Sequence, residues 1–168
     1  MPAQGEEAGR LYELTLVGVP VGIMARTQEW FDALMREFDI IAATGDLEGP
    51  PERLVEYVHQ VRERFSRFSG QSDAAFDRAV AEGRTSFDQV LSLPVAAGGA
   101  ATELLDLVTE AVRYCEEGEL LTLAAPEDVL RFTTWYLMEV ARQSEGARAR
   151  PWPALESAPN PPAEDDDG

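Results

Sequence analysis

The chain has 168 residues and a formal net charge of −17, which comes from 31 acidic and 14 basic side chains. The length suits one domain with short tails, and the hydrophobic content of 45% excludes wholesale disorder. All the basic residues are arginines, which excludes a Schiff-base lysine and a Walker A lysine, and the excess of acid disfavours binding to nucleic acid.

The first part of the chain predicts a strand followed by a long helix. Residues 1–10 are polar and acidic, unlike a secretory signal, and we expect them to form a flexible leader. Residues 11–19 (LYELTLVGV) have the apolar and β-branched composition of a strand, which Pro20 ends. Residues 23–43 predict a helix because apolar side chains recur at steps of three and four. This stripe consists of Met24, Thr27, Phe31, Leu34, Phe38 and Ile41.

The middle of the chain predicts two further helical regions. A connector rich in glycine and proline at 44–51 leads into a second helix over 51–68. A third helical region is expected over 73–91, and Gly83 weakens it and divides it into two pieces. The residues in near-helical register there are Phe76, Val80, Phe87 and Val90.

The last part of the domain predicts two helices around a short strand. After a connector at 94–99, a fourth helix is expected over 101–117, with Gly118 as its left-handed terminator. Residues 119–124 (ELLTLA) are a second strand candidate. A fifth helix is expected over 126–144, because a proline opens it and two acidic residues occupy its first turn.

Together these elements predict a mainly α protein, a helical bundle of four to five helices with one or two short β-strands that can pair as a small two-stranded sheet. Residues 11–146 are expected to form the single helical domain. Residues 147–168, rich in proline and alanine and ending in acids, are expected to be a disordered tail apart from a docked Trp152. With no apolar run of membrane-spanning length, the expected location is the cytoplasm, without membrane association.

The residue inventory leaves few means of catalysis. His59 is the single histidine, and with Glu56 it forms only one Glu-x-x-His half-motif, so a helix-surface histidine is expected. Cys115 falls within the apolar register of its helix, which favours a buried structural thiol over a nucleophile. The acids Glu116, Glu117 and Glu119 are typical of a solvated face. We therefore expect no catalytic residues, no metal site and no cofactor.

Two adjacent aromatic pairs on helices, Trp30–Phe31 and Trp135–Tyr136, are the most informative side chains. Neighbours on a helix point about 100° apart, so both members face inward only on an enclosed helix. A wide core stripe is the favoured interpretation, and the alternative is a ligand cavity or a partner surface.

An arginine-rich face on the second predicted helix is the other candidate. Arg53, Arg62, Arg64 and Arg67 lie there with two glutamates. A solvated face with local ion pairs is favoured, and the alternative is a receptor for a carboxylate or phosphate. The candidate partner or ligand surface thus comprises Trp30, Trp135, Tyr136, Arg62 and Arg64.

Two segments carry a resemblance to other proteins: LYELTLVGVPVGIMARTQEWFDALMREFDIIA and LLTLAAPEDVLRFTTWYLMEVARQ. They resemble a group of actinobacterial proteins that tend to be encoded beside anti-sigma-factor ATPases, STAS-domain antagonists and SpoIIE-type phosphatases. The resemblance covers most of residues 11–145 and consists of hydrophobic patterns without catalytic residues. It implies a place in partner-switching regulation, with an anti-sigma or related regulator as partner.

Three hypotheses of function follow. The first is a non-enzymatic regulatory module for protein–protein interaction, supported by the depleted catalytic inventory and by a charge that could steer a basic partner. The second is a small-molecule sensor with a pocket between helices, lined by Trp30, Tyr57 or Tyr136. The third is an enzyme that uses carboxylates or arginine alone. Apolar stripes on short helices also allow a homodimer.

Overall fold

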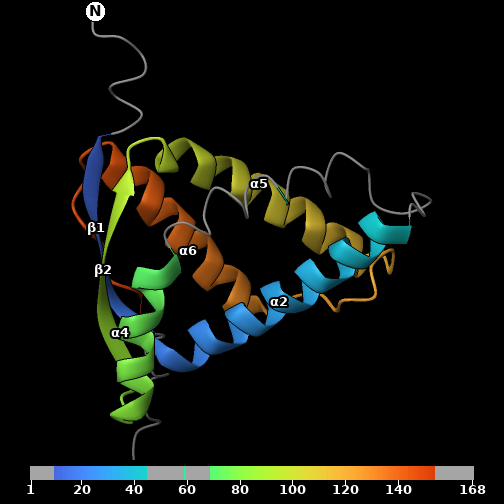
Figure 1. The fold of residues 1–168 in the computed structure, drawn as a ribbon, viewed down its shortest axis with the longest axis horizontal. Coiled ribbons are helices and arrows are strands. Elements are labelled where there is room, and N and C mark those ends of the chain that lie inside the picture. Colours follow the sequence, from blue (N-terminus) through green and yellow to red (C-terminus); the bar gives the residue numbers. More distant parts are fainter. Residues whose placement is uncertain (1–9, 45–58, 60–68, 154–168) are drawn as a thin grey trace, which may run out of the picture.

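The computed structural model describes residues 10–44, 59 and 69–153. These residues form a mainly helical fold with a small antiparallel sheet of two strands, which confirms the predicted fold class (Figure 1). The elements are β1 (Leu11–Pro20), α2 (Val21–Thr44), α4 (Ser69–Ala81), β2 (Ser86–Pro94), α5 (Ala97–Glu116) and α6 (Glu127–Ser144).

The second strand lies where a helix was predicted. Phe87 and Val90 are three apart, a spacing that fits a helix, but residues 86–94 form β2 and pair with β1. The burial of β2 alternates, with Phe87, Gln89, Leu91 and Leu93 buried. The polar Gln89 on this inner face masked the period of two. Gly83, at φ +65°, follows the end of α4 before the strand begins, so the chain does divide near this glycine, but the second piece is a strand and not a helix.

The prediction of a strand at 119–124 is wrong. This segment is an irregular connection between α5 and α6, and it pairs with no strand among the described residues. Leu120 and Ala125 are buried at its two ends, while Leu121 and Leu123 point into solvent. The apolar composition of this segment therefore reflects two buried residues and two exposed ones, and not the alternating pattern of a strand.

Strand β1 contains a bulge that changes what its outer edge can bind. The register shifts between Leu16 and Val19, and Gly18 occupies the left-handed region at φ +72°. Its N–H donates to Asp88 Oδ1 at 2.8 Å. The Val17 carbonyl oxygen accepts a hydrogen bond from the Trp152 N–H at 2.9 Å. At this bulge β1 is thus bound by Trp152 as well as by β2.

The long helices agree with their predicted positions. α2 covers the predicted 23–43, and α6 covers the predicted 126–144 apart from Pro126, its N-cap. α5 begins at Ala97, before the predicted start. Gly98 in its first turn lets α5 approach α6 closely, because a Cβ there would lie 1.9 Å from Ser144 Oγ. Gly118 has φ +73° just past α5, as predicted. The helix predicted over 51–68 lies outside the described residues except for His59.

The buried side chains form two clusters. One lies under the sheet, between both strands, α4, the start of α5 and most of α6. The other joins α2, the second half of α5 and the start of α6, and includes Trp30, Phe38 and Val129. Helix α6 contributes to both clusters, and it crosses the middle of the fold in Figure 1. Its placement therefore determines how the two halves are joined.

The packed chain continues beyond the predicted domain end at 146. Residues 147–153, which we call the strap, return along α6 towards β1, and Trp152 is docked as predicted. Gly146, at φ +88°, allows the reversal at the end of α6. The tail predicted after the strap, like the leader at 1–9, lies outside the described residues.

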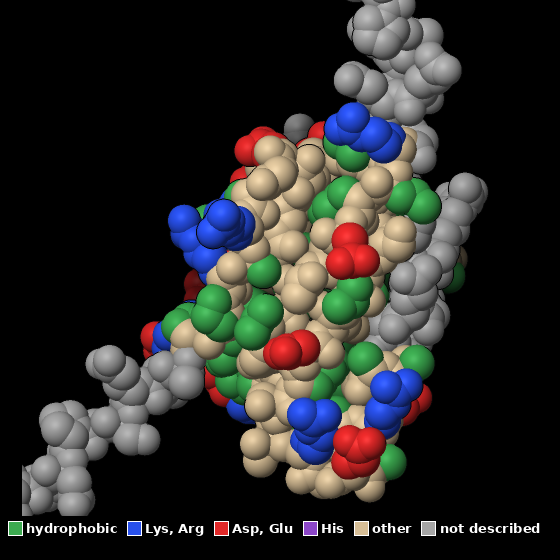
Figure 2. All heavy atoms as spheres, turned by 90° about the vertical axis from the view of Figure 1, so that its left-hand side faces the viewer, with side chains coloured by type: hydrophobic (Ala, Val, Ile, Leu, Met, Phe, Trp, Pro, Cys, Tyr) green, Lys and Arg blue, Asp and Glu red, His purple; other side chains and the backbone are tan. Residues whose placement is uncertain are grey.

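The outer face of the sheet is a mixed surface. Leu11 and Val90 are exposed there, and Glu13 and Asp88 lie on the same strands. Figure 2 shows scattered hydrophobic side chains on this side of the molecule, interleaved with acidic and other polar ones. Within the described part of the chain, no helix is both long and apolar enough to cross a membrane.

We expect Phe38→Ala to lower the free energy of unfolding by about 3–5 kcal/mol, because the fully buried ring would leave a cavity between α2 and α5. Leu121→Ala, at an almost wholly exposed position, should change it by less than about 0.5 kcal/mol. Urea denaturation followed by circular dichroism measures both values. A loss of unfolding free energy for Phe38→Ala that is no larger than the loss for Leu121→Ala would show that this cluster does not stabilise the fold.

Tyr12 should make stability depend on alkaline pH. Burial raises its pKa to about 12, and its O–H donates to the Val140 carbonyl oxygen at 2.9 Å. The folded protein thus holds this proton more tightly than the unfolded chain, whose tyrosines have pKa values of about 10. The resulting stability is complete below pH about 10 and is lost as pH rises towards 12. Urea denaturation across this range should show a shallower decline for Tyr12→Phe than for wild type; parallel declines would contradict the assignment.

Candidate functional site

The two predicted tryptophan positions have different surroundings. Trp30 is buried in the cluster between α2 and α5, and its Nε1–H donates to the Leu123 carbonyl oxygen at 3.0 Å. Its ring meets Phe31 edge-on, with centroids 5.0 Å apart. Trp30 is therefore a core residue that also holds the connection before α6, in agreement with the favoured interpretation.

Trp135 and Tyr136 lie half-buried on α6, around the buried ring of Phe132. The strap adds Trp152, whose ring centroid is 5.4 Å from that of Trp135 in an edge-to-face arrangement. The Trp135 Nε1–H donates to the Arg150 carbonyl oxygen at 3.2 Å. These aromatic contacts attach the strap to α6 and leave part of both indole rings at the surface.

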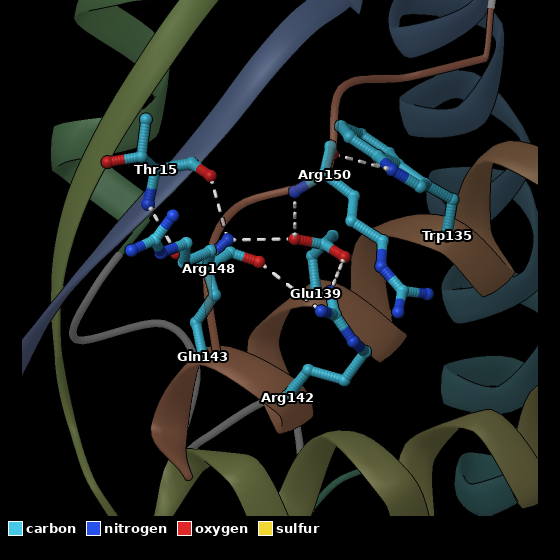
Figure 3. A network of polar contacts seen from close by, with 7 residues as sticks. All are labelled: Thr15, Trp135, Glu139, Arg142, Gln143, Arg148 and Arg150. Carbon is cyan, nitrogen blue, oxygen red and sulfur yellow. Dashed lines mark hydrogen bonds and ion pairs between the residues drawn. The ribbon is translucent and has the colours of Figure 1, made fainter. Parts of the chain in front are cut away.

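A buried polar network lies next to these rings, at the end of α6 (Figure 3). Glu139 is only 2% exposed, and its carboxylate accepts hydrogen bonds from the Arg142 guanidinium, from Gln143 Nε2 at 2.9 Å and from the Arg150 backbone N–H at 3.0 Å. Three donors from the helix and the strap thus balance one buried carboxylate. The network fixes the strap and holds Arg142 along the surface of α6.

The same network reaches β1 through Gln143. Its Nε2 donates to the Thr15 carbonyl oxygen at 2.8 Å, and its Oε1 accepts from the Thr15 N–H at 3.0 Å. The side-chain amide therefore pairs with the strand as a neighbouring peptide group would. Figure 3 shows Gln143 extending from α6 between Thr15 and Glu139.

The exposed side of α6 and the strap together form an open groove of about 460 Å³, which we call the α6 groove. Its apolar floor includes Leu130, Met138 and the two indole rings. Arg131, Arg142 and Arg150 bring positive charge to it. The remaining lining residues are Glu127, Thr134, Glu139 and Pro153. On a chain with net charge −17, the groove combines apolar surface with a local group of cations.

The connection before α6, residues 119–125, is a second unusual surface, which we call the leucine loop. Leu121 is 93% exposed and Leu123 is 83% exposed. Glu37 of α2 holds the backbone between them: its carboxylate accepts from the Leu121 N–H, from the Thr122 N–H at 2.7 Å and from Thr122 Oγ1 at 2.6 Å. With the Trp30 bond to Leu123, the loop is fixed while its two leucine side chains remain in water.

The other candidate residues do not assemble into a site. Cys115 is buried among apolar side chains, as predicted, and burial, followed by the charge of Glu37, raises the pKa of its thiol. His59 is half-exposed, with Nε2 3.6 Å from Asp39 Oδ1. Arg62 and Arg64 lie outside the described residues, as does Tyr57, so the arginine face and the sensor pocket stay predictions.

The three acids near the end of α5 lie on a solvated face. Glu116, Glu117 and Glu119 are exposed, and Glu117 pairs with Arg113 at 3.2 Å, as expected of a solvated face. In the described part of the chain, no group of three or more histidine, cysteine, aspartate or glutamate side chains could hold a metal ion.

Glu139, Gln143 and the strap arginines were not predicted from the sequence. A signal was present: Phe132, Tyr136, Glu139 and Gln143 follow steps of four, three and four, so two polar residues occupy positions of the inward face of α6. A polar residue at such a position requires a partner. The leucine loop was seen only as an apolar segment, because its exposure depends on contacts with α2.

Comparison with protein-family models, with curated proteins and with solved structures gives no match to the chain. The α6 groove and the leucine loop are therefore the surfaces from which a function is inferred.

We expect Glu139→Ala to release the strap and to lower the free energy of unfolding by about 3 kcal/mol, since removing one member of a buried ion pair leaves its partners without compensation. Trypsin should then cleave after Arg148 faster than in wild type. Glu145→Ala, at the exposed end of the same helix, is the matched control. Equal cleavage rates in all three proteins would show that Glu139 does not hold the strap.

Proposed function

We propose that the chain is a non-enzymatic regulatory protein of the cytoplasm that binds another protein through the α6 groove. The supporting observation is the composition of the groove, in which partly exposed tryptophans and Met138 lie among three arginines. Tryptophan and arginine are enriched among the residues that dominate binding energy at protein interfaces. Apolar surface that remains exposed beside two buried clusters is typical of an interaction surface.

The chemistry of the groove defines the kind of partner. Arg131, Arg142 and Arg150 favour carboxylates, and the apolar floor favours large hydrophobic side chains. The complementary ligand is thus an acidic segment of a protein that carries one or two apolar anchors. Because the chain as a whole is strongly acidic, the three arginines of the groove are favourable contacts for such a segment.

Two observations favour protein binding over the other hypotheses. The groove is open along α6, whereas small-molecule pockets enclose most of their ligand. Glu139, the buried carboxylate beside it, already accepts hydrogen bonds from three donors, which leaves it poorly suited to act as a base. An open groove and a carboxylate that already accepts its hydrogen bonds are both ordinary for a surface that binds a peptide segment.

Partner-switching regulation is the setting we propose for this binding, with an anti-sigma factor or related regulator as partner. Its support is the resemblance carried by residues 11–145 to proteins encoded beside such regulators. Switching requires a surface that one partner occupies at a time. A single groove bordered by α6 and the strap meets this requirement.

Met138→Asp should weaken binding of the native partner at least tenfold, because it places a negative charge on the apolar floor where an acidic segment binds. Met138 is 48% exposed, so the fold should be retained. Val80→Asp on α4, at a position that is 52% exposed, is the matched control.

Proteins that co-purify with the wild-type chain from the native host are identified, produced separately and titrated against the three purified proteins by calorimetry. A stoichiometric partner that binds wild type and Met138→Asp equally well would overturn the assignment of the groove.

A further inference from the structure

The leucine loop and the α6 groove are two exposed surfaces that follow one another along the chain. The loop directly precedes α6, and the groove runs along that helix from Glu127 to Arg142. Within the groove, Leu130, Thr134 and Met138 follow one side of α6 at steps of four. This spacing gives a helix one continuous face.

The loop and the groove are chemically complementary. The loop presents Leu121 and Leu123 beside the exposed acid Glu119. The groove presents apolar floor residues beside Arg142 and Arg150. Leucine side chains with an acidic border are what the groove is suited to bind, and this chain carries such a segment itself.

We propose that a second copy of the chain binds here, with the leucine loop of each copy in the α6 groove of the other. Two contacts of one kind form at once, which closes the assembly at two copies.

The fixed shape of the loop supports the same inference. Glu37 and Trp30 hold the loop with four hydrogen bonds, three to its backbone and one to the Thr122 hydroxyl, while the two leucines lie in water. A loop already held in one conformation loses little conformational entropy when it binds. Docking would remove from water the two most exposed large hydrophobic side chains of the described residues.

The dimer would also regulate the groove. A docked leucine loop occupies the surface that the proposed function assigns to an acidic partner segment, so the two binding events exclude each other. This regulatory part rests on the proposed function, whereas the dimer itself does not. Weakening the dimer should make the groove more available and should strengthen partner binding.

Sedimentation velocity of the full chain over about 1–500 µM tests the dimer at two salt concentrations. We expect a monomer–dimer equilibrium that weakens at high salt, because exposed charge pairs are screened. Leu121→Asp with Leu123→Asp (the loop variant) and Met138→Asp (the groove variant) should each weaken dimerisation at least tenfold. Val80→Asp should leave it unchanged. A wild-type chain that stays monomeric throughout, or a dimer unaffected by both variants, would overturn the proposal.

A mixture of the two variants gives the sharper test. One wild-type loop and one wild-type groove remain in each mixed pair, so energy transfer between differently labelled chains should exceed that in either variant alone. If loops packed on loops or grooves on grooves, mixing would restore nothing, and the proposed geometry would be wrong.

Partner titration separates this inference from the proposed function. If the loop variant binds the partner more tightly than wild type does, the regulatory part is supported. A dimer that behaves as described but shares its groove with no partner would remove the proposed function and leave the dimer. A chain that stays monomeric, but whose partner binding needs Met138, would remove the dimer and leave the proposed function.

Discussion

The pair of hydrogen bonds between the Gln143 amide and the Thr15 backbone determines how the rest of the fold is joined. A sheet of two strands has little stability by itself and needs packing on one face and protection at its edges. Gln143 supplies edge contacts from a helix that also packs beneath the sheet. Because α6 is attached to β1 at this point, its opposite side faces outward and becomes the floor of the groove.

Glu139 connects this structural role to the binding surface. The carboxylate holds Arg142 on one side, Gln143 on another and the strap backbone on the third. The conformation of the groove is thus coupled to a network whose loss would also expose the edge of β1. Binding at the groove and stability of the sheet share the same few residues, so substitutions within the network would alter both together, whereas Met138 can be changed with less effect on the fold.

Much of the fold could be predicted from local patterns, and the errors have physical causes. The stripe of α2 is long and regular, and Gly118 lies where a helix needs a residue of positive φ. Strand β2 was not predicted from the sequence because the buried Gln89 interrupts the alternation of apolar and polar residues. The leucine loop looked like a strand by its composition. Composition alone does not show which backbone N–H groups will donate hydrogen bonds to a carboxylate that is distant in sequence.

The candidate site was only partly foreseeable for the same reason. Trp135 was recognisable as one of two adjacent aromatic residues, yet its neighbour Trp152 comes from a strap that follows the helix after a sharp reversal. The arginines of the groove are separated in sequence and belong to no motif. The proximity of Arg142 and Arg150 depends on Glu139, whose role is visible only once the strap is seen to return along α6.

The strap has a consequence for the order in which the protein is made. Strand β1 leaves the ribosome well before Gln143 and Trp152, which bind its outer edge. At synthesis rates of about 5–20 residues per second, that edge lacks these partners for several seconds in every nascent chain. During that interval the strand can pair with other nascent chains on the same messenger RNA. Only completion of the strap closes this route, so the final residues of the fold also act as its protection against misassembly.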